Sequence, residues 1–212
     1  MQNIKLVIFD LDGTLVDAYA AINSSFNYVM RRLGLKPKSA GLIRRAVGWG
    51  DANLLKPYVG ERDLELALSL YRRHHEHSLL KQSRLYPQVR PLLRKLKDKG
   101  YKLAVASNRP GKFSLILLRH LRIIEFFDYV LCADKLKRGK PDPEILNETI
   151  SRFAVKKSQV LYAGDMVIDA QVGRRAGIKT VIVTTGSSSL SEIKKERPFK
   201  IIHEISGLSV LL

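Results

Sequence analysis

The sequence predicts an α/β fold in which a parallel sheet is flanked by helices and an all-helical segment is inserted near the N-terminus. Strand-like runs alternate with helix-length segments over most of the chain, which is typical of right-handed βαβ crossovers. The runs 103–106 and 160–163 are continuously apolar, as expected for strands covered on both faces. The interval 16–85 contains amphipathic helical stretches and no convincing strand, so it indicates an insertion.

The alternating part of the chain predicts six strands and the helices between several of them. The strands are expected at 5–10, 102–107, 129–132, 160–164, 180–184 and 201–205. The helices are expected at 87–99, 111–120, 143–153 and 170–176. Gly100 and Gly177 follow two of these helices and are typical helix stops.

The interval 16–85 is interpreted as a helical cap, which leaves residues 1–15 and 86–212 as the core. Helical patterns at 18–33 and 63–80 are separated by several glycines and prolines. A helical lid inserted beside a sheet can exclude water from a site and select what enters it.

The bulk composition is that of a globular chain, with 45% hydrophobic and 27% charged residues. The single cysteine, Cys132, excludes an internal disulfide and is interpreted as an inert core thiol in a reducing compartment. No apolar stretch approaches transmembrane length, and the first apolar run is too short for a signal peptide. We therefore expect a cytoplasmic protein without a membrane partner, and either a monomer or a homodimer.

The net charge of +17 is the one unusual bulk property. Three interpretations remain open: a dispersed basic surface, a field that attracts anionic substrates such as phosphate esters, and nucleic-acid binding. Because the basic residues are scattered and no nucleic-acid module is recognisable, nucleic acid is the least favoured partner.

Two carboxylates, Asp10 and Asp12, follow the first predicted strand directly and lead into Gly13-Thr14. In open parallel sheets, ligands bind beyond the carboxyl ends of the strands. An aspartate there can act as a nucleophile, which is the role expected for Asp10. Asp12 is placed to protonate a leaving alkoxide and then to deprotonate water. The alternative is a pair of turn-capping aspartates.

The second strand ends in Ser107-Asn108, whose hydroxyl and backbone N–H groups can hold phosphate oxygens or simply form a turn. Lys140 precedes Pro141, which keeps its backbone extended, and its ammonium can stabilise phosphoryl-transfer charge. Asp165 and Asp169 follow the fourth strand and can complete a hard-cation site for Mg²⁺. Asp169 can instead cap a helix that begins at residue 170.

These four elements, in this order, resemble the four motifs of the haloacid dehalogenase-like hydrolase superfamily. The resemblance implies a Rossmann-like catalytic core, an aspartyl-phosphate intermediate and Mg²⁺ as cofactor. It also implies that the Asp10 and Asp165 side chains and the Asp12 carbonyl bind the metal, with Asp169 supporting through water.

The second aspartate narrows the resemblance. Dehalogenating relatives lack a carboxylate at the place of Asp12, so its presence points to phosphatases and phosphomutases. The continuation 13–17 and the placement of the cap look most like phosphoglycolate phosphatase and its relatives. Met166 departs from that subgroup, in which a small hydroxyl residue is frequent.

Substrate selection is expected in the cap. Arg44, Arg45 and Lys56 flank Gly48 and Gly50 and are candidate contacts to an anionic substrate group, unless they form a solvated helix face with Trp49 as packing. The run 72–77 contains three histidines but lacks further metal ligands, so it is interpreted as a solvated helix.

The sequence therefore predicts a Mg²⁺-dependent phosphatase acting on small phosphorylated metabolites. A phosphomutase of the β-phosphoglucomutase type is the nearest alternative, and a catalytically silent, basic nucleic-acid-binding protein is the alternative from another class. The sequence does not name the phosphate ester.

Overall fold

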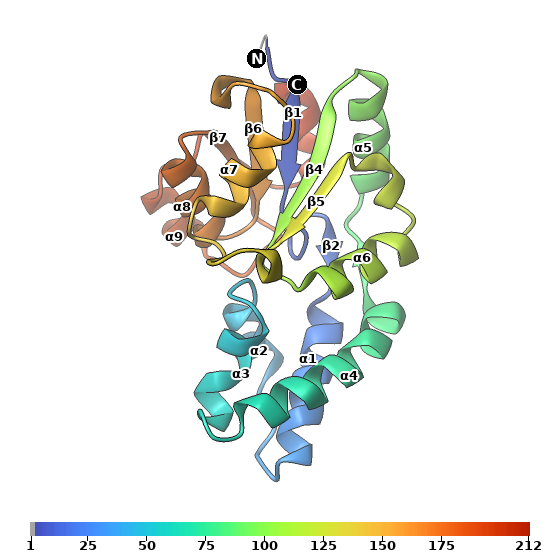
Figure 1. The fold of residues 1–212 in the computed structure, drawn as a ribbon, viewed down its shortest axis with the longest axis vertical. Coiled ribbons are helices and arrows are strands. Elements are labelled where there is room, and N and C mark those ends of the chain that lie inside the picture. The colour runs from blue at the N-terminus through green and yellow to red at the C-terminus, as the bar shows by residue number, and fades with distance from the viewer. Residues whose placement is uncertain (1–2) are drawn as a thin grey trace.

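The computed structural model describes residues 3–212 and has an α/β core with a helical insertion (Figure 1). A six-stranded parallel sheet runs in the order β5-β4-β1-β6-β7-β8. Its strands are β1 (Leu6–Phe9), β4 (Lys102–Ser107), β5 (Tyr129–Cys132), β6 (Val160–Gly164), β7 (Lys179–Val183) and β8 (Lys200–Ile202). The predicted α/β class, with a parallel sheet flanked by helices and a helical insertion, is confirmed.

Helices cover both faces of the sheet. They are α5 (Val89–Asp98), α6 (Gly111–His120), α7 (Glu144–Ser151), α8 (Val167–Ala176), α9 (Leu190–Lys195) and α10 (Leu208–Leu211). Strand β1 shows how the faces divide, because successive side chains of a strand point to opposite sides. Val7 and Phe9 pack in the cluster that contains α5 and α6, whereas Leu6 and Ile8 pack with α7 and α8.

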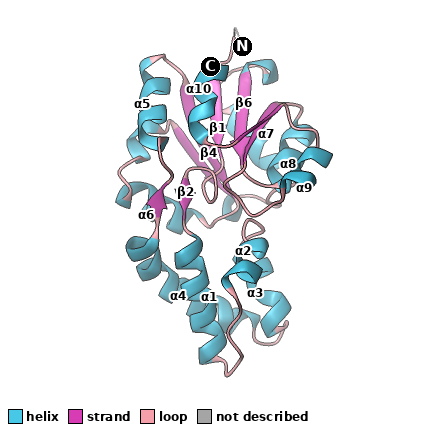
Figure 2. Ribbon diagram, turned by 180° about the vertical axis from the view of Figure 1, so that it is seen from behind, coloured by secondary structure: helices cyan, strands magenta, loops and turns pink. Residues whose placement is uncertain are grey.

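The insertion consists of four helices. They are grouped at one end of the sheet (Figure 2). They are α1 (Tyr19–Arg32), α2 (Ala40–Ala46), α3 (Asp51–Val59) and α4 (Leu64–Gln82), and we call them the cap. Helices α1 and α4 pack along one another, and the cap side chains of Phe26, Leu55 and Tyr71 are fully buried. The cap side chains join the same apolar cluster as one face of the sheet.

Two very short strands join the cap to the core. Strand β2 (Val16–Asp17) pairs antiparallel with β3 (Arg84–Leu85), where the chain enters and leaves the cap. The expectation that 16–85 contains no strand is therefore wrong at both ends. Two residues are too few for the alternation that marks a strand in a sequence.

The ends of the elements follow ordinary capping chemistry. Gly177 adopts the left-handed conformation (φ 72°) after α8, and Gly100 (φ 82°) follows α5, so both predicted helix stops are confirmed. Helix α8 begins at Val167, three residues before the expected start, because Asp169 is its third residue rather than its cap. From that position the Asp169 carboxylate accepts the backbone N–H of Met166.

Candidate active site

The first carboxylate lies at the carboxyl end of β1, in the centre of the sheet. Asp10 is buried, and its Oδ1 is 2.8 Å from the Lys140 ammonium nitrogen. Burial raises the pKa of Asp10, and the positive charge of Lys140 opposes that rise. Lys140 therefore stabilises Asp10 in the ionised form that a nucleophile needs.

Lys140 occupies a buried position between two carboxylates. Its Nζ is 2.8 Å from Asp169 Oδ1 as well as 2.8 Å from Asp10, and it donates to the Tyr162 hydroxyl at 3.0 Å. Burial alone would lower the pKa of Lys140, but the charges of Asp10 and then Asp169 raise it. The structure thus brings together Asp10, Lys140 and Asp169, which lie far apart in the sequence.

Ser107 and Asn108, at the carboxyl end of β4, lie beside Asp10. Ser107 is buried, and its Oγ accepts the backbone N–H of Arg109 at 3.2 Å. The Asn108 amide donates to Gly48 O in the cap (2.9 Å) and accepts from the Lys140 backbone N–H (2.8 Å). The side chain of Asn108 therefore connects the cap with the loop that carries Lys140.

Three buried aspartates, Asp10, Asp165 and Asp169, form a candidate metal site in the described part of the chain, with ligand atoms within 4.8 Å of one another. Asp165 Oδ1 accepts the Thr14 hydroxyl at 2.7 Å, whereas its Oδ2 is buried and has no hydrogen-bond partner among the described residues. Burial, followed by the charges of Asp169 and Asp10, raises the pKa of Asp165. A divalent cation would offset this crowding of negative charge.

Two glycines keep open the space beside Asp165 Oδ2. A Cβ on Gly13 would lie 2.2 Å from this oxygen, and one on Gly186 would lie 2.1 Å from it. An unpartnered carboxylate oxygen beside two glycines fits a hard cation, which prefers oxygen ligands.

Asp169 is less available than the other two aspartates. Its Oδ1 accepts from Lys140 and from the Tyr162 hydroxyl (2.6 Å), and its Oδ2 accepts the backbone N–H groups of Asp165 and Met166. With both oxygens engaged, Asp169 fits a supporting role, in which it orients the Asp165 backbone and Lys140, better than direct ligation.

Arg109 is the residue at this site that the sequence reasoning did not single out. Its guanidinium is buried and clasps Asp12 with two hydrogen bonds, from Nε to Oδ2 at 2.8 Å and from Nη2 to Oδ1 at 2.7 Å. Its third nitrogen, Nη1, is 2.7 Å from Nε2 of His75 in α4. The available signal was a third polar residue directly after Ser107-Asn108 at a strand end.

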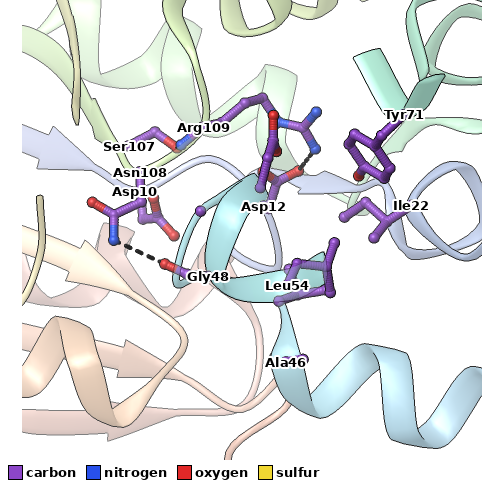
Figure 3. A pocket seen from close by; sticks show the side chains of 13 residues that line it. Asp10, Asp12, Ile22, Ala46, Gly48, Leu54, Tyr71, Ser107, Asn108 and Arg109 are labelled. Carbon is purple, nitrogen blue, oxygen red and sulfur yellow. Dashed lines mark hydrogen bonds and ion pairs between the residues drawn. The ribbon is translucent and has the colours of Figure 1, made fainter. Parts of the chain in front are cut away.

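A pocket with an empty volume of about 440 Å³, including its open mouth, lies between the core and the cap (Figure 3). The core contributes Asp10, Asp12, Ser107, Asn108 and Arg109. The cap contributes Ile22, Ala46, Val47, Gly48, Gly50, Asp51, Leu54 and Tyr71.

The three cap cations selected from the sequence do not line this pocket. Arg44 donates from Nη2 to the carbonyl oxygen of Thr185 in the core at 2.8 Å. Arg45 lines a different groove between the cap and the core, and Lys56 pairs with Glu61 on the cap surface. Their predicted contact with substrate therefore has no support in the geometry of this pocket.

The histidine run in α4 is not wholly solvated. His75 is 1% exposed, because it lies on the helix face that also buries Tyr71, Ser78 and Leu79. His77 is exposed, as expected for a solvated helix. The interpretation of the run as a solvated helix is thus wrong for His75.

Comparison with known proteins agrees with this geometry. The family model described as haloacid dehalogenase-like hydrolase matches residues 7–183, which include all the core motif residues. The chain belongs to this family. The resemblance seen in the sequence is thereby confirmed, and the protein is a hydrolase of the haloacid dehalogenase-like family.

Several known proteins resemble the chain over most of its length. A phosphoglycolate phosphatase from Nitrosospira multiformis is 35% identical over 191 residues, covering 86% of this chain and 84% of the relative. One from Aquifex aeolicus is 28% identical over 202 residues, covering 93% and 95%. The crystal structure of a predicted phosphoglycolate phosphatase from Haemophilus somnus superposes on this chain with a TM-score of 0.93 at 27% identity, covering 100% of this chain and 99% of that protein.

No helix in residues 3–212 of this haloacid dehalogenase-like hydrolase is both long and apolar enough to span a membrane.

Proposed function

We propose that the protein is a Mg²⁺-dependent phosphatase that hydrolyses small phosphate monoesters through an aspartyl-phosphate intermediate. The observation that carries this proposal is the convergence of Asp10, Lys140 and Asp165 beside Asp12 at one edge of the sheet. A nucleophile, a fixed cation, a candidate metal ligand and an acid–base group are the parts that such a reaction requires.

In the first step, a carboxylate oxygen of Asp10 attacks phosphorus, and the bond from phosphorus to the leaving oxygen breaks. Asp12 supplies the proton that the leaving oxygen takes up. The Ser107 hydroxyl, the Asn108 backbone N–H and the Lys140 ammonium are assigned to the phosphoryl oxygens.

In the second step, Asp12 removes a proton from water, and the water oxygen attacks phosphorus. The bond between phosphorus and Asp10 then breaks, which releases inorganic phosphate and restores both carboxylates. Asp10, Asp165 and the Asp12 carbonyl would hold Mg²⁺, with Asp169 supporting them. When bound, the ion supplies positive charge that offsets repulsion between Asp10 and the phosphate.

The names of the relatives make phosphoglycolate the first ester to test. On the cap side the pocket is lined by apolar side chains such as Ile22, Ala46 and Leu54, together with the carboxylate of Asp51. Assays of a panel that also contains pyrophosphate, nucleoside monophosphates and sugar phosphates would show which substrate is hydrolysed with the highest kcat/KM.

The decisive experiment measures phosphate release from p-nitrophenyl phosphate and from the panel, with Mg²⁺ and with a chelator. Wild type is expected to be active with Mg²⁺ only, and Asp10→Asn is expected to lose roughly 10³-fold or more in kcat. Asp98→Asn, a change at an exposed aspartate of α5, is the matched control and should retain activity. Appreciable turnover by Asp10→Asn would refute the assigned nucleophile, and sugar-phosphate interconversion without phosphate release would identify a mutase instead.

A further inference from the structure

Asp12 is held from the cap through a continuous chain of hydrogen bonds. Arg109 binds both oxygens of Asp12, at 2.8 and 2.7 Å, in the two-pronged geometry that fixes a carboxylate most firmly. Two nitrogens of the guanidinium are used in this way, and the third faces His75. Asp12 and Arg109 belong to the core, whereas His75 belongs to cap helix α4.

The direction of the hydrogen bond between Arg109 and His75 follows from the chemistry of the guanidinium, and the Ser25 hydroxyl that comes next also lies 3.2 Å from Nδ1 of His74. Arg109 can only donate, so His75 Nε2 must accept and its Nδ1 must carry the proton. Nδ1 then donates to Ser25 Oγ (3.1 Å), and the Ser25 hydroxyl donates to Ala21 O (2.9 Å). The chain thus ends on the backbone of cap helix α1, and His75 fits it only as a neutral ring.

Packing fixes the His75 ring as well. The ring stacks on Tyr71 with centroids 4.7 Å apart, and its edge meets Phe113 of core helix α6 at 5.5 Å. His75 is 1% exposed and Arg109 is 7% exposed, so neither group has solvent as an alternative partner. A shift of α4 relative to the core would therefore move the nitrogen that Arg109 faces.

We propose that Arg109 is the positioning residue for the acid–base carboxylate of Asp12, and that His75 anchors it to the cap. This inference rests on the proposed phosphatase function, in which Asp12 hands a proton to the leaving oxygen. Arg109 orients the Asp12 carboxylate, and His75 makes that orientation depend on the docked position of the cap. Each Asp12 oxygen has a second lone pair that Arg109 does not use, and the proton that Asp12 transfers is carried there; Arg109 transfers no proton itself.

Leaving-group chemistry separates this role from a merely structural one. An alkyl leaving group needs a proton as its bond to phosphorus breaks, whereas p-nitrophenolate is stable enough to leave without one. Because kcat/KM reports the first irreversible step, a misplaced Asp12 lowers kcat/KM for an alkyl ester far more than for p-nitrophenyl phosphate. General acid catalysis contributes roughly 10²- to 10⁴-fold, which leaves ample range for the effect.

The variants are chosen in matched pairs. Arg109→Lys keeps the positive charge but loses the fork that grips both oxygens. His75→Leu removes the acceptor, and His75→Gln restores a neutral acceptor close to the place of Nε2. His77→Leu makes the same change at an exposed histidine of the same helix and serves as the control.

The measured quantity is the ratio of kcat/KM for phosphoglycolate or glycerol phosphate to kcat/KM for p-nitrophenyl phosphate. We expect this ratio to fall about 10-fold or more in Arg109→Lys and by a smaller factor in His75→Leu. It should stay within about 2-fold of wild type in His75→Gln and His77→Leu. Circular dichroism and urea unfolding verify that each variant is folded.

Each result of these measurements either supports or contradicts the proposed roles of Arg109 and His75. A drop of equal size for both esters, or no drop, in Arg109→Lys overturns the positioning role. An unchanged ratio in His75→Leu overturns the anchoring role of the cap. If the wild-type protein hydrolyses no ester in the presence of Mg²⁺, both the proposed function and this inference are wrong. That failure is distinguishable from failure of the inference alone, because it is seen in the wild type without any variant.

Discussion

Replacing His75 with glutamine should flatten the dependence of folding stability on pH between about pH 7.5 and 5.5. Burial, followed by the charge of Arg109, lowers the pKa of His75 well below its ordinary value of 6.5. Protonation of the folded protein would place an imidazolium 2.7 Å from a guanidinium. The ring therefore remains neutral in the folded state throughout this range.

The sign follows from proton binding in the two states. The unfolded chain protonates His75 below its ordinary pKa of 6.5, whereas the folded chain does not, so acid favours unfolding. The contribution of the neutral His75 ring to the free energy of unfolding is fully present above pH 6.5. It is lost as the pH falls toward the lower pKa that His75 has in the folded state. At about one pH unit below the ordinary pKa, the loss amounts to about 1.4 kcal/mol.

The assay is urea unfolding followed by the fluorescence of Trp49, at three pH values across this range. Wild type should lose about 1.4 kcal/mol more than His75→Gln between the highest and lowest pH. His74, whose pKa burial also lowers, is present in both proteins. Parallel pH profiles for the two proteins would refute the claim that the folded state holds His75 neutral.

Two further predictions concern the buried charges and the metal cradle. Lys140→Met should lower the free energy of unfolding by about 3–5 kcal/mol in urea, because Asp10 and Asp169 would lose their shared cation, and a loss below about 1 kcal/mol would contradict this. Gly13→Ala should weaken Mg²⁺ binding about 10-fold or more in calorimetric titration, because its Cβ would lie 2.2 Å from Asp165 Oδ2 at a backbone φ of 84°. Unchanged affinity in Gly13→Ala would place the cation elsewhere.

Residues at the ends of parallel strands were well suited to prediction from the sequence. Asp10, Ser107 and Asp165 follow apolar runs, and the carboxyl ends of parallel strands lie along one edge of the sheet. Their proximity therefore follows from the topology alone. The ranges 102–107, 129–132 and 160–164 match strands β4, β5 and β6 because apolar runs bounded by polar residues define a buried strand.

Contacts between the cap and the core could not be predicted in the same way. The hydrogen bond from Arg109 to His75 joins the loop after β4 to one face of α4. It forms only because the cap packs against the core in this orientation. Periodicity can show that His75 shares a face with Tyr71, but it cannot show what that face meets. Arg44 and Lys56 were selected for their charge, yet the orientation of α2 and α3 directs both away from the pocket.

The pairing of β2 with β3 has a consequence for how such enzymes can change. Val16 lies opposite Leu85, so the four-helix module departs from the sheet and rejoins it at neighbouring points. An insertion of another length could replace the cap at this junction without changing the order of the strands in the core sheet. The chain can therefore acquire a different cap, and with it a different substrate range, while the carboxylates at the ends of β1 and β6 stay in place.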